Sequence, residues 1–299
     1  MNVIPAPIPP QPKDSYFQND YPDFDWCSLH VEHSILPYRH FQKHTHNFSE
    51  AFILLSGSTV HLVEDRAYPV GKGCVCVLKG DTVHGFRDCE NLEIINLMYD
   101  SRTFFGVQDK LRTIPGFDPL FLIEPEIRSH KEYPCSLILE DEDLERVKTL
   151  SDLAIDLLAK GKKEYSVTIQ MLFFTLVSFL SARYVAQGGT AQKIQVLARA
   201  IRFMEEHLAT PIRVGDVAGH AMVSPRHLER LFCEYYGKSP VEYLTEARLR
   251  RSLAMLSRTD LDVTEVAERC GFSDPSYFSR VFKQNYGVSP SKVTRRIVY

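Results

Sequence analysis

The chain has 299 residues, of which 44% are hydrophobic, 24% charged and 11% aromatic. This composition excludes a disordered chain, a collagen-like repeat and a small disulfide-stabilised scaffold, and the length favours two domains. The formal net charge of −3 combines a net charge of −8 for residues 1–189 with +5 for residues 190–299, where 17 Lys and Arg stand against 12 Asp and Glu. The basic C-terminal third favours nucleic acid as a partner.

The N-terminal residues predict an extended arm on a cytoplasmic protein. Five prolines occur in the first twelve residues, a composition typical of an extended segment and not of a secretory signal. The seven cysteines form no CxxC pair, which favours a reduced, cytoplasmic chain. We therefore assign residues 1–26 to a Pro-rich arm.

Residues 27–186 predict a β-rich domain with flanking helices. From Cys27 to about Tyr99, short runs of alternating apolar and polar residues are separated by Gly or Asp, which is typical of a small antiparallel barrel. Apolar residues then repeat at helical spacing over 144–158, and the uncharged stretch Tyr165–Ala182 follows. Its Thr, Ser and Gln residues favour a core or interface helix over a membrane span. The two helices either form a homodimer surface or cover the open face of the barrel.

The barrel region contains two histidine motifs. His44, His46 and Glu50 follow the pattern HxHxxxE, and His84 completes a Gly(x)10His pattern. These spacings resemble the two motifs of the cupin fold, which implies all four residues as metal ligands. Three interpretations stay open: histidines hydrogen-bonded at a barrel rim, a transition-metal site of three imidazoles and a carboxylate, or a pocket in which these residues and Arg39 bind the hydroxyl groups of a sugar.

Residues 193–299, which follow a predicted linker at 187–192, have a helical pattern with an internal repeat. The segment Pro211–Pro240 aligns with a second segment that ends at Pro290, at an offset of 49 residues before a central turn and 50 after it. Each copy predicts two helices joined by a short turn, because a cap residue and a proline begin the second helix. The sequence therefore predicts two helix-turn-helix corners.

The two turns differ at one position. In the second copy Gly271 suits the left-handed end of the first helix, and Asp274 caps the next helix. In the first copy Ser224 is the cap, and Met222 stands in place of the glycine. We therefore expect the first turn to be wider or to carry about 1 kcal/mol of strain.

The second helix of each corner carries the candidate base contacts. Arg226, Glu229 and Arg230 lie at i, i+3 and i+4 and share one face near the helix N-terminus, where recognition helices meet base edges. Arginine can bind guanine and glutamate can bind cytosine. A connecting helix over about 241–257 would hold the two corners about 34 Å apart. Its arginines, which would contact phosphate or solvent, are Arg248, Arg250 and Arg251. The related positions of the second copy are Asp274, Ser276 and Arg280.

Residues 211–296 resemble the DNA-binding domain of the AraC/XylS family of bacterial transcription regulators, since Ala267–Arg296 follows the signature of that family. The resemblance implies two helix-turn-helix units, double-stranded promoter DNA as partner, and the six positions named above as the base-reading residues. Residues 36–99 resemble the sensor barrel of the rhamnose-responsive members of the same family. This second resemblance implies a small sugar-like effector and favours the sugar pocket.

Together these features predict a two-domain α+β protein, with an N-terminal cupin-like antiparallel β-barrel and a C-terminal all-α double helix-turn-helix domain. The predicted function is that of a cytoplasmic transcription regulator, not an enzyme, that activates carbohydrate-use genes when an effector shifts its conformational equilibrium. We expect a homodimer that contacts RNA polymerase and has no membrane partner and no cofactor. Two alternatives stay open: a cupin metalloenzyme (oxygenase or isomerase), and a constitutive DNA binder whose barrel only mediates dimerisation.

Overall fold

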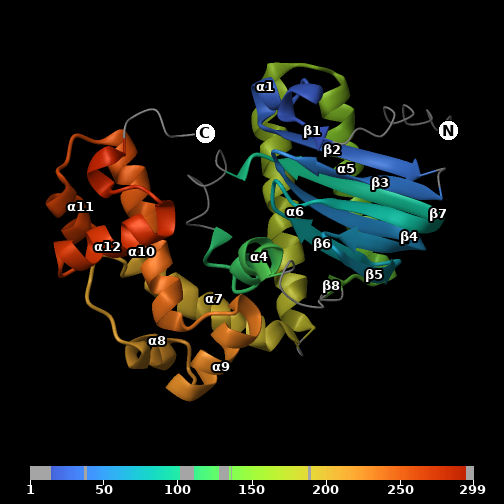
Figure 1. The fold of residues 1–299 in the computed structure, drawn as a ribbon. Helices are drawn as coiled ribbons and strands as arrows, with labels where there is room; N and C mark the ends of the chain where they lie inside the picture. The colour runs from blue at the N-terminus through green and yellow to red at the C-terminus, as the bar shows by residue number, and fades with distance from the viewer. Residues whose placement is uncertain are drawn as a thin grey trace. The chain divides into compact units, whose positions relative to one another are not determined.

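The chain folds into two compact units, residues 1–195 and 196–299 (Figure 1). The computed structural model describes residues 15–36, 39–101, 111–127, 135, 137–187 and 190–293. The first 14 residues of the predicted arm and Gly188 and Gly189 of the predicted linker lie outside these ranges. Helix α7 (Thr190–Glu206) begins inside the predicted linker. The N-terminal unit is built on a β-sheet and the C-terminal unit is helical, which confirms the predicted two-domain α+β organisation.

The sheet of the N-terminal unit has the order β1-β3-β7-β4-β6-β8, with β2 paired to β7 and β5 paired to β4. Strand β1 runs parallel to β3, and the other strand pairs among the described residues are antiparallel. The strands are β1 (Ser15–Tyr16), β2 (Leu29–Leu36), β3 (His40–His46), β4 (Ser49–Val63), β5 (Arg66–Gly71), β6 (Cys74–Leu78), β7 (His84–Tyr99) and β8 (Leu137–Ile138).

Both faces of the central strands are buried, because alternate side chains enter two different cores. In β4, Ala51 and Ile53 join the core that also contains the helices. Their neighbours Phe52 and Leu54 join a second core, on what we call the inner face of the sheet. Continuous apolar runs are expected for strands that are buried on both sides. The inner face therefore has room for polar groups only where this apolar pattern is interrupted.

Helices cover the opposite face of the sheet. They are α1 (Phe24–Cys27), α4 (Glu124–Ile127), which follows a π-helical turn (Asp118–Ile123), α5 (Asp141–Ala159) and α6 (Ser166–Ala186). In α6, Phe173 and Leu180 pack into the helix-side core, whereas Val167 and Met171 are 66% and 52% exposed. The span Lys163–Ala186 is long and apolar enough to cross a membrane by length and composition alone. One buried and one exposed apolar face agree with a core or interface helix.

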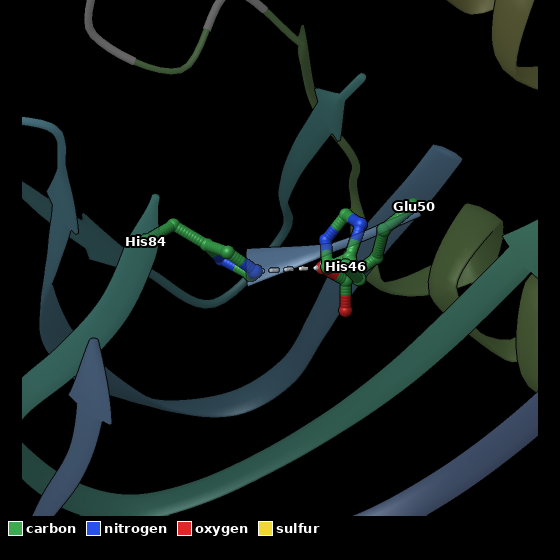
Figure 2. Close-up of side chains that lie close together, drawn as sticks. All are labelled: His46, Glu50 and His84. Carbon is green, nitrogen blue, oxygen red and sulfur yellow. Dashed lines mark ion pairs between the residues drawn. The ribbon is translucent and has the colours of Figure 1, made fainter. Parts of the chain in front are cut away.

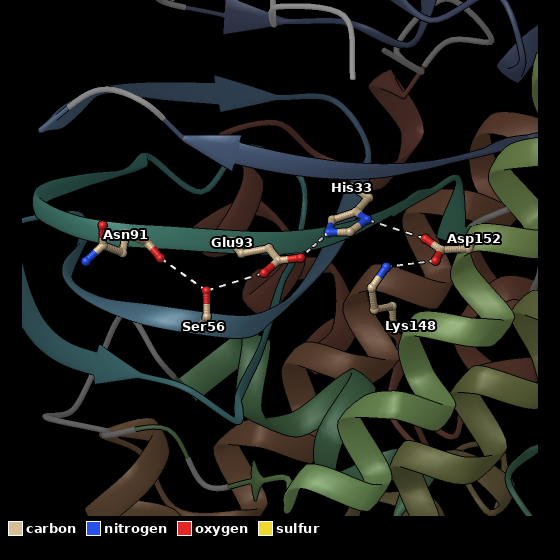
Figure 3. Close-up of polar contacts among 6 residues, drawn as sticks. All are labelled: His33, Ser56, Asn91, Glu93, Lys148 and Asp152. Atoms are coloured by element: carbon tan, nitrogen blue, oxygen red, sulfur yellow. Dashed lines mark hydrogen bonds and ion pairs between the residues drawn. The ribbon is translucent and has the colours of Figure 1, made fainter. Parts of the chain in front are cut away.

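A polar network joins the sheet to helix α5 (Figure 3). His33 of β2 contacts Glu93 of β7 through Nε2 at 2.8 Å and Asp152 of α5 through Nδ1 at 3.4 Å. Lys148 extends the network along the helix, with Nζ 2.8 Å from the Asp152 carboxylate. Ser56 of β4 approaches the other oxygen of Glu93 at 3.4 Å. His33 is therefore the link between two strands and the helix that covers them.

The C-terminal unit consists of helices. Beside the part of α7 that it contains, its described residues form α8 (Val214–His220), α9 (Pro225–Tyr236), α10 (Pro240–Arg258), α11 (Val263–Arg269), α12 (Pro275–Tyr286) and a 3-10 turn at Pro290–Lys292. The side chains that pair α11 with α12 include Val266, Phe278 and Phe282, and Leu249 joins them from α10. This arrangement follows the sequence repeat.

We predict that His33→Ala lowers the free energy of unfolding of the N-terminal unit by about 0.5–1.5 kcal/mol, because the half-buried Glu93 and the exposed Asp152 lose their shared partner. The control is Lys148→Ala, which removes only an exposed pair within one helix and should cost no more than about 0.5 kcal/mol. Urea unfolding followed by circular dichroism measures both. An equal loss of unfolding free energy in the two variants would show that the His33 contacts with Glu93 and Asp152 add no stability.

Candidate functional site

The first predicted corner is formed by α8 and α9. Val217 and Ala218 of α8 are buried, and Leu228 of α9 is buried beneath them in the same unit. Ser224 caps α9, since its side chain accepts a hydrogen bond from the backbone N–H of His227 at 3.2 Å. The corner is thus the one that the sequence repeat predicts.

The second corner repeats this backbone arrangement with α11 and α12. In the first turn the N–H of Val223 donates to the carbonyl of Ala218 at 3.0 Å, and in the second the N–H of Phe272 donates to that of Ala267 at 2.9 Å. The residue that precedes each donor is left-handed, with φ of +59° at Met222 and +83° at Gly271. The first turn is therefore not wider than the second, and the alternative expectation of strain at Met222 holds.

Gly271 is fixed by more than its backbone angle. A Cβ atom at this position would lie 2.1 Å from the carbonyl oxygen of Leu208. That carbonyl accepts a hydrogen bond from Nε of Arg248 at 2.9 Å, and the same guanidinium donates to the carbonyl of Thr210 at 2.8 Å. The prediction that Arg248 contacts phosphate or solvent was wrong, because its donors hold the chain segment before α8. Met222 lies at the surface instead, with a side chain that is 82% exposed.

The predicted base-reading residues of α9 lie together on its exposed face. Arg226, Glu229 and Arg230 are all exposed. Arg230 makes one contact with its own helix, from Nη2 to Nδ1 of His227 at 3.1 Å. Exposed guanidinium groups of this kind can bind a ligand without breaking a hydrogen bond or ion pair in the protein interior.

The corresponding residues of α12 include one with a structural role. Oδ1 of Asp274 accepts the backbone N–H of Ser276 at 2.8 Å and so caps the helix. Ser276 and Arg280 are exposed, and the Arg280 guanidinium lies over the ring of Tyr277, 5.4 Å from its centroid. Asp274 can still offer its second carboxylate oxygen to a ligand.

A pocket opens on the inner face of the β-sheet, where the apolar pattern is interrupted. It has a volume of about 80 Å³. Four of the five residues predicted for the pocket line it, and three of these, His46, Glu50 and His84, come together from β3, β4 and β7 (Figure 2). The complete lining is Tyr16, Tyr21, Glu32, Ser34, Leu36, Phe41, His44, His46, Phe48, Glu50, His84, Phe86, Ile94 and Asn96.

His46, Glu50 and His84 surround one point. Oε2 of Glu50 is 3.3 Å from Nε2 of His46 and 3.3 Å from Nε2 of His84. The side chains of Glu50 and His84 are deeply buried, with 6% and 1% of their surface exposed. These three residues carry donor atoms within 4.8 Å of one another, so they could hold a metal ion. Among the described residues, this set is narrower than the predicted four.

His44 lies beside this group and faces the N-terminal segment. Its ring is 4.3 Å from that of His84 and makes edge contacts with Tyr16 at 5.0 Å and Phe41 at 5.1 Å, all between centroids. Burial lowers the pKa of His44. Burial also holds the pKa of His84 well below its ordinary value, and the neighbouring His44 and His46 act in the same direction. Both imidazoles are therefore favoured in the neutral form.

The N-terminal segment contributes two tyrosines to the pocket wall. Tyr16 of β1 is buried against His44, and Tyr21 packs edge-on against Phe48 with 5.6 Å between ring centroids. Burial, followed by the charges of Glu32 and Glu50, raises the pKa of the Tyr21 hydroxyl. Tyr16 and Tyr21, which lie within the predicted arm, thus form part of the pocket wall.

Sequence reasoning missed several pocket residues and included one that is absent. Arg39 is exposed and is not among the residues that line the pocket. Asn96 and Glu32 do line it, and Oδ1 of Asn96 is a buried acceptor with no hydrogen-bond partner among the described residues. The sequence feature that could have predicted them is a polar residue on the inward side of an apolar strand. Asn96, for example, lies two residues after the buried Ile94 and therefore on the same side of β7.

Comparisons with known proteins find similarity over most of the chain. A family model described as a helix-turn-helix domain matches residues 217–296. The chain is 27% identical over 258 residues to the HTH-type transcriptional activator RhaS of Escherichia fergusonii, covering 86% of this chain and 89% of that protein. The RhaS protein of Klebsiella pneumoniae is 27% identical over 261 residues with the same coverage.

Among solved structures, the similarity covers about a third of the chain. A transcriptional regulator with an AraC-type DNA-binding domain from Chromobacterium violaceum is 33% identical to this chain. The match covers 33% of this chain and 88% of that chain, with a TM-score of 0.32.

We predict that the two turns respond in opposite ways to substitution. Gly271→Ala should lower the free energy of unfolding of the C-terminal unit by more than the roughly 1–2 kcal/mol of a left-handed backbone, because its Cβ also meets the Leu208 carbonyl. Met222→Gly should raise that free energy by up to about 1 kcal/mol. Thermal and urea unfolding measure both variants. A destabilised Met222→Gly protein would show that the first turn is not strained.

Proposed function

We propose that this protein activates carbohydrate-use genes when a small sugar-like effector binds in the sheet pocket. The chain belongs to the AraC family of helix-turn-helix transcription regulators. The family consists of transcription regulators and not of enzymes, so the metalloenzyme alternative is set aside. The observation that carries the proposal is the combination, in one chain, of two equivalent DNA-binding corners and a polar pocket buried in a separate unit.

The exposed faces of α9 and α12 support base reading. Arg226 and Arg230 project from the first half of α9, and Arg280 projects from α12. Arginine binds O6 and N7 of guanine in a bidentate manner, and Glu229 can accept from cytosine. We infer that the corners enter successive major grooves, with α10 as the connection between them. Asp274 and Ser276 complete the second reading surface, with Asp274 limited to the oxygen that its cap leaves open.

The pocket has the character of a site for a polar, uncharged ligand. Its acceptors and donors include Asn96, Glu32, Ser34 and His44. Aromatic rings line the same space, which suits the apolar face of a sugar ring. Tyr16 and Tyr21 of the N-terminal segment line the pocket, so a ligand that fills it either contacts or displaces these aromatic rings. The order of that segment can therefore report whether the pocket is filled.

The assembly that we propose is a cytoplasmic homodimer that contacts RNA polymerase. Val167 and Met171 lie at i and i+4 on the exposed face of α6, and such an apolar face gains stability when a second copy covers it. The proposed contact with RNA polymerase follows from transcriptional activation, the activity for which the RhaS relatives are named. The alternative of a constitutive DNA binder predicts the same dimer but no response to a ligand.

We predict that Arg230→Ala weakens binding at one base pair. If Arg230 reads a guanine, its loss should cost about 1–3 kcal/mol on the cognate operator and much less on an operator altered at that base. Fluorescence anisotropy with the two duplexes, at several salt concentrations, gives both values and the salt slope. Arg251→Ala, an exposed change on α10, is the matched control and should affect both duplexes equally. An equal loss on both duplexes for Arg230→Ala would make it a phosphate contact.

We also predict that a sugar panel identifies ligands by thermal stabilisation of the N-terminal unit, because binding to the folded state raises stability by mass action. Asn96→Leu keeps the side-chain size and removes the amide, so it should weaken that ligand by about 1–3 kcal/mol. Arg39→Ala, which is outside the pocket, is the control and should leave the shift unchanged. A panel without any stabilising ligand would favour the constitutive DNA binder.

A further inference from the structure

In both α9 and α12 an aromatic side chain lies one turn before an arginine that we expect to read a base. Arg230 is the sixth residue of α9, and His227 is the third. In α12 the same two places are taken by Arg280 and Tyr277. The offset of 50 residues between the two corners relates one pair to the other. Residues three positions apart are neighbours on a helix surface, so the two side chains of each pair can touch.

In α9 the contact is a hydrogen bond. Nη2 of Arg230 lies 3.1 Å from Nδ1 of His227. A guanidinium group only donates hydrogen bonds, so Nδ1 accepts and the hydrogen of the neutral imidazole is on Nε2. The backbone N–H of His227 donates to the cap residue Ser224, so the ring projects from the fixed first turn of the helix. Because arginine has five donors, this one bond leaves enough of them for a bidentate contact with guanine.

In α12 the contact joins a cation to an aromatic ring. The Arg280 guanidinium lies 5.4 Å from the centroid of the Tyr277 ring, which is within the range of a cation–π interaction. The Tyr277 ring lies in turn 6.4 Å from the ring of Phe272, a residue that is only 5% exposed. Phe272 belongs to the turn of this corner, where its backbone N–H donates to the Ala267 carbonyl. The guanidinium is therefore linked through one ring to the turn.

An arginine that is already held in place loses less conformational entropy when it binds DNA. Fixing one long, flexible side chain at an interface costs a free energy equivalent to roughly 2- to 10-fold in affinity. A contact that restricts the guanidinium before DNA arrives reduces this cost. The two corners use different interactions, a hydrogen bond in α9 and a cation–π contact in α12, on the arginine at the same helix position. The feature that they share is the restriction of that arginine.

We propose that His227 and Tyr277 are positioning residues, which hold Arg230 and Arg280 in the orientations that read bases. This inference rests on the proposed function, in which the two arginines contact bases in the major groove. Each ring acts through its arginine, because its loss leaves the guanidinium in place but allows it to adopt more conformations. Operator affinity therefore falls on loss of either ring, but only as long as the corresponding arginine is present.

The test is a double-mutant cycle on the full-length protein. The probe is the DNA duplex that the unaltered protein enriches most strongly from a random-sequence pool, and fluorescence anisotropy measures its affinity. His227→Leu and Tyr277→Leu should each weaken binding by about 2- to 10-fold. In proteins that already carry Arg230→Ala or Arg280→Ala, respectively, the same leucine substitution should change the affinity by less than about 2-fold, because the two side chains of a pair act together. The result is evaluated for each pair separately.

Conservative variants separate positioning from a general effect on the helix. Tyr277→Phe keeps the ring and should retain the affinity of the unaltered protein. His227→Asn supplies an acceptor oxygen near the place of Nδ1 and should recover most of the affinity that His227→Leu loses. Leucine is the better helix former, so loss of helix would rank these two variants in the opposite order. Gln284→Leu is the matched control, because it makes the same substitution at an exposed position two turns after Tyr277, and it should leave the affinity unchanged.

The failure of positioning and the failure of base reading give different results. Full operator affinity in a leucine variant, with a loss in the matching arginine variant, overturns positioning and leaves base reading intact. A leucine effect of undiminished size in the Arg→Ala protein also overturns positioning, because it marks the ring as a direct contact with DNA. Arg230→Ala and Arg280→Ala proteins that bind the duplex like the unaltered protein overturn base reading by these arginines, and positioning with it.

Discussion

The burial of both faces of the central strands is the constraint on which the N-terminal unit depends. Because Ala51 and Ile53 enter one core and Phe52 and Leu54 the other, a shift of one residue in the register of β4 would exchange the two cores. Glu50 shares the inner face with Phe52 by the same alternation. The apolar residues that fix the register thereby also fix where the Glu50 carboxyl group lies. It is buried, and its Oε2 is 3.3 Å from Nε2 of both His46 and His84.

The two corners of the C-terminal unit show how one backbone motif tolerates different residues. Both turns contain the same hydrogen bond and the same left-handed residue. At Gly271 the neighbouring Leu208 carbonyl, oriented by Arg248, leaves no room for a side chain. At Met222 the position is open to solvent, so the only cost is that of the backbone conformation. Packing around the turn, and not the turn itself, decides which copy requires glycine.

Local patterns predicted the parts of the molecule that depend on local chemistry. The cap residues Ser224 and Asp274 fixed the start of both second helices, and the spacing of His46, Glu50 and His84 brought together residues that are up to 38 positions apart in the sequence. The pocket wall depends on tertiary contacts that no short window contains. Tyr16 reaches His44 only because β1 pairs with β3. Arg248 illustrates the opposite error, since an arginine on a connecting helix looks available for phosphate until Leu208 and Thr210 are brought to it by the fold.

Communication between a filled pocket and DNA requires that the ligand bind two states of the protein with different affinities. The N-terminal segment supplies such a difference, because Tyr16 and Tyr21 contact pocket residues directly. A ligand that adds contacts to these rings stabilises the ordered segment, whereas one that displaces them stabilises the open form. The direction of regulation is thus set by the side of the pocket that the ligand occupies. Under the proposed function, a ligand that contacts Tyr16 or Tyr21 from within the pocket favours the form in which these rings line it, because that form alone offers those contacts.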